Sequence, residues 1–313
     1  MLRTLIVGFS RAGMGLHWQV LRRMREAEPD SGLLSELPVM VYDLRDVRER
    51  AARSGVVVAS SLRRARAELE PDETVIHLCT PPTARLEILR ELAELGFRHI
   101  LVEKPLAADR DTLRRIDELR RTHGLQLMVV AHWLDSSLTR NLRELLRSGE
   151  LGSLRSISVL QTKPRHTRTL AARGHPTAFE VEAPHSLGVV LSLAGDAEVA
   201  TATAGDMHVG EQVVPLMGSA HLVLRHHDGT RTEIFSDLTS PVRERRITLR
   251  LTRGLVVGHY SAGQDDRYAH LWVRADGREW RKLLPDDALM AFLSRAYRQF
   301  TVGEAPEAEL ELN

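Results

Sequence analysis

The stretch His99-Ile100-Leu101-Val102-Glu103-Lys104-Pro105 joins a short apolar run, typical of a buried strand, to an acid, a lysine and a proline. Lysine is scarce in this chain, because only Lys104, Lys163 and Lys282 occur among 43 lysines and arginines. Parallel sheets bind ligands at the carboxyl ends of their strands. Lys104 is therefore placed where an ammonium group can act, although the tripeptide alone is equally explained by a surface lysine.

The amino-terminal end of the chain has a second pattern that indicates a ligand site after a buried strand. Thr4–Val7 is predicted to be a buried strand, and a glycine turn and a helical pattern follow it. This is the context in which Gly-x-Gly-x-x-Gly binds a dinucleotide, although Ser10 stands in the middle position here. Gly8 allows a tight turn, Gly13 allows close packing, and the helix start offers N–H groups to a pyrophosphate. The predicted phosphate site comprises Gly8, Ser10, Arg11, Ala12 and Gly13. A plain strand-to-helix turn is the alternative.

Asp43 follows the second predicted strand, Val39–Tyr42. An acid at this place accepts hydrogen bonds from an adenosine ribose and repels a 2′-phosphate. Asp43 therefore favours NAD, while Arg45 could accommodate NADP. An ordinary acid at a strand end is the alternative.

The order of the predicted elements changes near residue 130. Before it, strands alternate with amphipathic helices, which predicts a doubly wound parallel sheet. After it, strands dominate, and Arg246–Thr252 alternates apolar and polar residues as in an antiparallel sheet with one face in water. We therefore predict an α/β plus α+β chain: a Rossmann domain at 1–130, and a domain with a large, open-faced, mostly antiparallel sheet at 131–313. The second domain is expected to bind the substrate and form oligomers.

Composition excludes several classes of function. The net charge is +1 and the charged fraction 27%, so no basic footprint for nucleic acid or an anionic membrane is present. Cys79 is the single cysteine, which excludes an internal disulfide and a cysteine-based metal site, and no metal is expected. No run approaches the roughly 18 apolar residues of a membrane span, and no signal peptide precedes the first strand. We predict a cytoplasmic protein.

Five landmarks together resemble the family of glucose-fructose oxidoreductase and inositol dehydrogenase (Gfo/Idh/MocA). They are Gly8-x-Ser10-x-x-Gly13, Asp43, Thr80-Pro81-Pro82, Glu103-Lys104-Pro105 and the helix end at Leu145–Gly152. The resemblance covers nearly the whole chain. It implies that Lys104 contacts the nicotinamide ribose and the substrate hydroxyl and assists proton transfer. It also implies that Thr80, Pro81, Pro82 and Glu103 belong to the cofactor site, and that His185 is the histidine of the second-domain helix.

The chain departs from the family in several places. Gly188 stands where polyol-oxidising members carry an aspartate one turn after the histidine, and Glu182 is a candidate replacement. Arg85 replaces a common histidine. His132 and Trp133 stand where an arginine is common and are expected to line the cleft at the domain junction. Lys163 either faces the substrate or is an exposed strand-end lysine. The usual C-terminal helix, which packs back on the first domain, is expected to be short or missing.

The favoured hypothesis is an NAD(P)-dependent oxidoreductase acting on a secondary alcohol or ketone of a sugar, amino sugar or cyclitol, in specialised-metabolite biosynthesis. Lys104 is the expected proton relay, with His185 as its partner or as a ligand of the substrate hydroxyl. The alternatives are a reductase of an imine or double bond, and a dinucleotide-binding sensor without catalysis. We expect a homodimer or homotetramer formed through the C-terminal sheet, as in the family.

Overall fold

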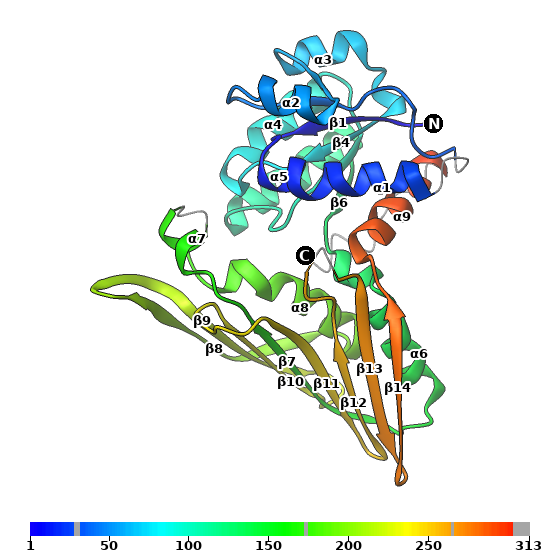
Figure 1. Cartoon of the computed structure of the whole chain (residues 1–313), viewed down its shortest axis with the longest axis vertical. Helices are drawn as coiled ribbons and strands as arrows, with labels where there is room; N and C mark the ends of the chain where they lie inside the picture. The colour runs from blue at the N-terminus through cyan, green and yellow to red at the C-terminus, as the bar shows by residue number, and fades with distance from the viewer. Residues whose placement is uncertain (28–31, 172–174, 264–265, 303–313) are drawn as a thin grey trace. The chain divides into compact units, whose positions relative to one another are not determined.

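The computed structural model describes residues 1–27, 32–171, 175–263 and 266–302 (Figure 1). The chain forms two compact units, and the division falls between Val130 and Ala131. The first unit holds Met1–Val130 together with the chain from Phe292 onward, and the second holds Ala131–Ala291. The sequence had placed the chain after Phe292 in the second domain.

Six parallel strands form the sheet of the first unit, in the order β3-β2-β1-β4-β5-β6. They are β1 (Arg3–Val7), β2 (Met40–Tyr42), β3 (Val57–Val58), β4 (Thr74–Leu78), β5 (His99–Val102) and β6 (Gln126–Val129). Every residue of β4 is buried, as expected for a parallel strand whose two faces are both covered by helices. The strand order reverses between β1 and β4, which is where doubly wound sheets bind their ligands. The predicted Rossmann sheet is confirmed.

Two of the helices of this unit have a side chain that caps their first turn. The helices are η1 (Gly13–Trp18), α1 (Gln19–Ala27), α2 (Arg48–Ser54), α3 (Leu62–Glu68), η3 (Pro71–Glu73), α4 (Pro82–Glu94) and α5 (Arg110–His123). Asp109 caps α5 by accepting a hydrogen bond from the Thr112 amide at 2.8 Å. Gly124 ends the same helix in the left-handed conformation that glycine adopts without strain.

The last helix, α9 (Ala288–Val302), contributes its second part to the first unit. Tyr297 is fully buried there, and its hydroxyl lies 2.6 Å from Thr4 Oγ1 and 2.9 Å from His77 Nε2. The Phe300 ring stacks on His99 at 5.0 Å. The expectation that the family's C-terminal helix is short or missing is therefore wrong. Its partners lie far away in the sequence, with 220 positions between Tyr297 and His77 and 293 between Tyr297 and Thr4.

Eight strands form the sheet of the second unit, in the order β14-β13-β12-β11-β7-β10-β9-β8. They are β7 (Leu154–Thr162), β8 (Ala197–Val209), β9 (Gln212–His226), β10 (Arg231–Asp237), β11 (Glu244–Leu251), β12 (Gly254–His259), β13 (Tyr268–Ala275) and β14 (Arg278–Pro285). All neighbours are antiparallel except β7 and β10. The sequence did not predict β14, because Leu284 is its one buried residue and no alternation shows.

Helices cover one face of this sheet and leave the other open (Figure 1). The helices are η4 (His132–Asp135), α6 (Ser137–Ser148), α7 (His166–Ala171) and α8 (Phe179–Ala194). Ile247 and Leu249 of β11 are buried in the core beneath them, while Arg250 of the same strand is exposed. The predicted open-faced, mostly antiparallel sheet is confirmed. The helix α8 begins at Phe179, so Pro184 lies inside it.

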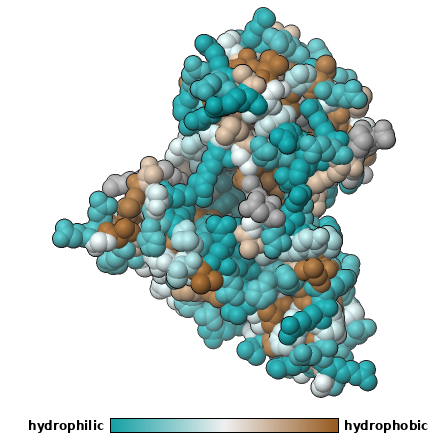
Figure 2. All heavy atoms as spheres, in the orientation of Figure 1, coloured by the Kyte–Doolittle hydropathy of each residue, from teal (hydrophilic) through white to brown (hydrophobic). Residues whose placement is uncertain are grey.

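The surface visible in Figure 2 is mostly hydrophilic, with hydrophobic residues in small separate groups. Among the described residues, no helix has the length and apolar character that crossing a bilayer requires.

The packing of the glycine turn can be tested with two neighbouring glycines. A Cβ atom at Gly13 would come within 2.9 Å of Ile6 Cγ2 and closer still to the Gly8 carbonyl oxygen, whereas one at Gly15 would meet nothing within 4 Å. We expect Gly13→Ala to destabilise the protein by about 1–3 kcal/mol through overpacking. Gly15→Ala should be neutral or stabilising by up to about 1 kcal/mol, because alanine favours a helix. Equal urea-unfolding midpoints for the two variants would contradict this account.

Candidate functional site

The glycine turn after β1 leaves no room for side chains. Gly8 has a φ of 95°, and its N–H donates to the Tyr42 carbonyl at 2.8 Å. A Cβ atom on Gly8 would lie 3.0 Å from the carbonyl carbon of Cys79. Gly13 packs directly on the Gly8 carbonyl, and η1 begins at this residue. The residues present therefore fit a pyrophosphate, which needs close approach of the backbone at the start of a helix.

Asp43, directly after β2, forms a two-pronged ion pair with Arg45. Arg45 Nε and Nη2 each lie 3.1 Å from a carboxylate oxygen of Asp43, and the Arg45 amide donates to the same carboxylate at 3.0 Å. Burial opposes ionisation of Asp43, but these contacts hold its pKa below the ordinary value. The Asp43 side chain is 6% exposed and that of Arg45 66%. The acid is thus neutralised locally, and an exposed guanidinium is available to an anion.

Arg85 of α4 connects the loops that follow β4 and β5. Its guanidinium donates from Nε and Nη2 to the Thr80 carbonyl, at 3.0 and 2.8 Å, and from Nη1 to the Pro105 carbonyl. The residue is 2% exposed, and burial lowers its pKa to about 10 against the opposing effects of Glu103 and Cys79. The sequence showed Arg85 only as a departure from the family. Its place among the buried leucines of an amphipathic helix was the signal that could have revealed this role.

Lys104 lies between two anchored neighbours. The Glu103 amide donates to the Leu78 carbonyl at 3.0 Å, and its side chain accepts a hydrogen bond from His17 Nε2 at 2.9 Å. On the other side, the Pro105 carbonyl accepts from Arg85. Lys104 itself is half-buried. Its backbone is therefore fixed from both directions at the end of β5.

The structure brings the predicted cofactor residues to one edge of the first sheet. They follow β1 (Gly8, Ser10, Arg11, Ala12, Gly13), β2 (Asp43, Arg45), β4 (Thr80, Pro81, Pro82) and β5 (Glu103, Lys104). These four strands are neighbours in the sheet and run parallel. Their carboxyl ends therefore lie together, as the sequence predicted.

In the second unit, Trp133 of η4 lies in a stack of aromatic rings. It packs nearly parallel to Tyr260 at 4.2 Å and to His185 at 5.5 Å between centroids. His132 approaches the His185 ring edge-on at 4.6 Å. The Tyr260 hydroxyl lies 2.9 Å from Thr139 Oγ1, which donates to the Trp133 carbonyl at 2.6 Å. The structure thus brings His132, Trp133 and His185 together, and Trp133 is 4% exposed, which makes it a support for the histidines.

Lys163 and Glu182 form a buried ion pair. Lys163 Nζ contacts Glu182 Oε1, and the two side chains are 14% and 7% exposed. The pair joins the end of β7 to α8, one turn before His185. Lys163 is therefore not the exposed strand-end lysine that the sequence left open. Gly188, at the family's aspartate position, packs on the apolar Leu134 side chain at 3.7 Å, measured from an added Cβ.

Three of the buried polar side chains in the second unit have atoms without hydrogen-bond partners among the described residues. They are Gln161 of β7, with both its amide oxygen and nitrogen, Ser236 of β10 and Ser186 of α8, each 1% exposed. Gln161 and Ser236 are direct partners in the β7–β10 pair. The sequence analysis missed Gln161. Gln161 follows Ile157 and Val159 at every second position on the buried face of β7. A polar residue in this apolar pattern was the signal that could have revealed it.

Arg245 of β11 lies next to Gln161 in the sheet, because the two residues pair in the β7–β11 register. It donates to the Ser261 carbonyl at 2.8 Å, and its guanidinium lies 5.9 Å from the centre of the Trp133 ring. Burial, followed by repulsion from Arg243, lowers its pKa to about 10. No carboxylate in the described part of the chain forms an ion pair with Arg245.

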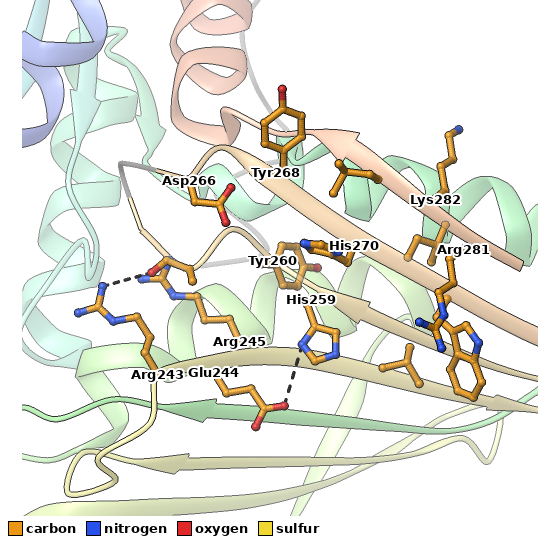
Figure 3. Close-up of a pocket in the computed structure, with 15 residues that line it drawn as sticks. Arg243, Glu244, Arg245, His259, Tyr260, Asp266, Tyr268, His270, Arg281 and Lys282 are labelled. Carbon is orange, nitrogen blue, oxygen red and sulfur yellow. Dashed lines mark hydrogen bonds and ion pairs between the residues drawn. The ribbon is translucent and has the colours of Figure 1, made fainter.

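Arg245 and Tyr260 also line a pocket of about 810 Å³ at strands β11–β14 (Figure 3). Its other polar residues include His259, His270 and Arg281, and Glu244 contacts His259 at 4.0 Å. None of the site residues predicted from the sequence lines it. Within the described ranges, no group of three or more histidine, cysteine, aspartate and glutamate side chains is placed to hold a metal ion.

The buried pair in the second unit gives a stability prediction. Lys163→Met leaves the Glu182 carboxylate buried and unpaired, so we expect a loss of about 3–5 kcal/mol in unfolding free energy. The double variant Lys163→Met/Glu182→Leu should recover most of this loss. Arg53→Met, which breaks an exposed pair with Glu49, is the control and should cost less than about 1 kcal/mol. Urea unfolding measures all three, and a double variant no more stable than Lys163→Met would refute the account.

Comparison with known proteins identifies a matching family model, a curated relative and solved structures with the same fold. Residues 2–132 match the model of the oxidoreductase family with an NAD-binding Rossmann fold. A dTDP-3,4-didehydro-2,6-dideoxy-alpha-D-glucose 3-reductase from Streptomyces antibioticus is 42% identical over 74 residues, which are 24% of this chain and 23% of that protein. The match thus spans less than a quarter of that curated relative.

Solved structures share the fold over nearly the whole chain. A 3-ketoreductase from Actinomadura kijaniata, solved with NADP and TDP-benzene, has a TM-score of 0.80 at 18% identity, over 99% of this chain and 93% of that one. A dehydrogenase from Clostridium difficile has a TM-score of 0.77 at 12% identity, over 99% and 94%. The family resemblance suggested by the landmarks is confirmed over residues 2–132, which match the model of the Gfo/Idh/MocA oxidoreductase family with an NAD-binding Rossmann fold.

Proposed function

We propose that this protein is a nicotinamide-dependent oxidoreductase that reduces a ketone of a nucleotide-linked sugar to a secondary alcohol. The observation that carries the proposal is the anchored Lys104 at the sheet edge that also holds the glycine turn. An ammonium group in that position can supply the proton that a carbonyl oxygen takes up on reduction.

NADP(H) is the proposed cofactor, with NAD(H) as the alternative. Asp43 alone favoured NAD, but its carboxylate is paired with Arg45, whose guanidinium is exposed and can receive a 2′-phosphate. The relative from Actinomadura kijaniata was solved with NADP. The cofactor would be held by the turn from Gly8 to Gly13, by Arg45 and by Thr80. When bound, it supplies or accepts the hydride, and the protein supplies position and electrostatics.

The proposed roles of the chain's own residues follow from proton balance. In reduction the substrate carbon gains a hydride, and its oxygen gains one proton from the Lys104 ammonium. In oxidation the neutral amine takes that proton back. His185, supported by the Trp133 ring, is proposed to bind the substrate hydroxyl or to pass the proton on. The lack of an aspartate at Gly188 is consistent with a binding role.

The polar groups of the second unit support a sugar nucleotide as the substrate. Gln161 and Ser236 present adjacent buried donors and acceptors without protein partners, which suits a ligand rich in hydroxyl groups. Arg245 is a half-buried cation that no described carboxylate neutralises, which suits a diphosphate. Two relatives are named as reductases of the 3-position, one of them for a dTDP-linked deoxy sugar.

Two alternative functions and three further predictions from the sequence are retained. An imine or double-bond reductase would use the same cofactor edge, and a sensor would bind cofactor without turnover. A specialised-metabolite pathway, a cytoplasmic location and a homo-oligomer formed through the open sheet face stay predictions.

Lys104 can be tested against another lysine of the chain. Lys104→Met should lower kcat for NADPH-dependent reduction of a dTDP-linked 3-keto sugar by about 100-fold or more, because the proton donor is lost. Cofactor affinity, followed by NADPH fluorescence, should change little. Lys282→Met is the control, because Lys282 lies on β14 and contacts Asn141. Turnover of Lys104→Met at the wild-type rate would refute the assigned role. Wild-type protein that binds NADPH but reduces no keto sugar would favour the sensor.

A further inference from the structure

A chain of hydrogen bonds runs through the centre of the first unit and ends at Glu103, next to Lys104. His17 Nε2 lies 2.9 Å from Glu103 Oε1, and His17 Nδ1 lies 2.7 Å from His77 Nδ1. His77 Nε2 lies 2.9 Å from the Tyr297 hydroxyl, which lies 2.6 Å from Thr4 Oγ1. Both histidines and the tyrosine are 0% exposed. The mechanism proposed above does not use this chain.

The chain draws on four elements that are distant in sequence. His17 lies in η1, His77 in β4, Tyr297 in α9 and Thr4 in β1. They meet inside an apolar core, where polar groups are stable only if their hydrogen bonds are complete. His17 lies in a π-helical segment, a geometry that is frequent at functional sites.

The contact between the two imidazoles decides the arrangement of protons, because two Nδ1 atoms can bond only as one donor and one acceptor. If His17 is an imidazolium, it donates both to Glu103 and to His77. His77 is then neutral and donates from Nε2 to Tyr297. If His17 is neutral, its Nε2 donates to Glu103 and its Nδ1 accepts from His77 Nδ1. His77 Nε2 then accepts from the Tyr297 hydroxyl. The two arrangements differ by one proton.

Charged and titratable groups on the neighbouring elements favour the first arrangement. They are Glu103 after β5, His77 in β4, Cys79 after β4, Tyr297 in α9, and Arg85 in α4, which acts on Glu103 and Cys79. Burial opposes the charged ring, but Cys79 and Glu103 more than offset it and raise the pKa of His17 to about 10. Burial and the nearby charge of His17 keep the pKa of His77 well below its ordinary value.

We propose that His17 is a positioning residue whose imidazolium holds Glu103 in place and compensates its charge, and that it thereby sets the position and the electrostatic environment of Lys104. The inference rests on the proposed role of Lys104 as the proton relay. With His17 charged, Lys104 stands beside a neutral ion pair. Without it, the Glu103 carboxylate next to Lys104 loses the positive charge that His17 supplies, which favours the ammonium form of Lys104 and delays the loss of its proton.

The charge of His17 can be measured without a substrate. The 14 histidines are labelled with ¹⁵N in the ring, and two-bond ¹H–¹⁵N spectra are recorded from about pH 6 to about pH 9. One ring should keep the imidazolium pattern throughout; it should vanish in His17→Gln and lose its proton at a lower pH in Glu103→Gln. His226, buried and bonded to Gly195 and Thr232, is an unchanged internal reference. A neutral His17 at neutral pH in the wild type overturns the proposal.

The raised pKa of His17 determines how the stability of the folded protein changes with pH. The folded protein binds the His17 proton more tightly than the unfolded chain, whose histidines titrate near pH 6.5. The stabilisation is therefore complete below that pH and is lost as the pH rises toward about 10.

The effect on Lys104 can be measured by competitive acylation of the lysines, quantified by mass spectrometry as a function of pH. In His17→Gln the labelling curve of Lys104 should move up by about one pH unit, because Glu103 loses the positive charge that His17 supplies. In Glu103→Gln, which should fold even if His17→Gln does not, it should not move up. Lys282 is the internal reference in both. A Lys104 curve that coincides with the wild type in folded His17→Gln overturns the proposal.

These two measurements need no turnover, so their outcome is separate from that of the proposed function. A failed keto-sugar assay with a shifted Lys104 curve rejects the substrate and keeps the positioning role. A successful keto-sugar assay with an unshifted Lys104 curve supports the substrate and rejects the positioning role.

Discussion

The hydrogen bond between His17 and Glu103 is the contact on which the arrangement of the first unit's candidate site depends. It ties the helix that begins at the glycine turn to the loop that carries Lys104. Arg85 supplies the complementary restraint by joining the carbonyls of Thr80 and Pro105. Three loops at the carboxyl ends of β1, β4 and β5 are thus fixed to one another by buried polar contacts. Such contacts are costly when incomplete, so they specify one geometry for the lysine.

The second unit follows a different principle, in which an apolar sheet face carries a few polar groups that have no hydrogen-bond partner among the described residues. Trp133 and Tyr260 stack to support His185, and Lys163 neutralises Glu182 beside it. Gln161 and Ser236, by contrast, keep unused hydrogen-bonding atoms. Stable folds rarely leave such groups without a partner, and a polar ligand is the natural one. The first unit thus holds a lysine whose backbone is anchored on both sides, and the second unit holds buried polar groups without a partner among the described residues.

Local patterns in the sequence predicted the elements that depend on local interactions. The period of two in β11, the helix patterns of the first unit and the glycine turn all follow from neighbours along the chain. Contacts between distant residues left no such pattern: His17 meets Glu103 across 86 positions, and Thr4 meets Tyr297 across 293. The packing of α9 on the first unit was mispredicted for this reason. Arg85 and Gln161 each broke an apolar pattern, which marked them as unusual without showing what they contact.

The most direct test of this account is a fluorescence titration of the protein with NADPH and NADH, on the wild type and on Arg45→Ala and Asp43→Ala. The account predicts that NADPH binds at micromolar concentration. Arg45→Ala should weaken NADPH much more than NADH, because only the former carries the 2′-phosphate. Asp43→Ala should weaken both, since the acid orients Arg45 and accepts from the ribose. If neither nucleotide bound to the wild type, the cofactor site and the enzyme built on it would both be refuted.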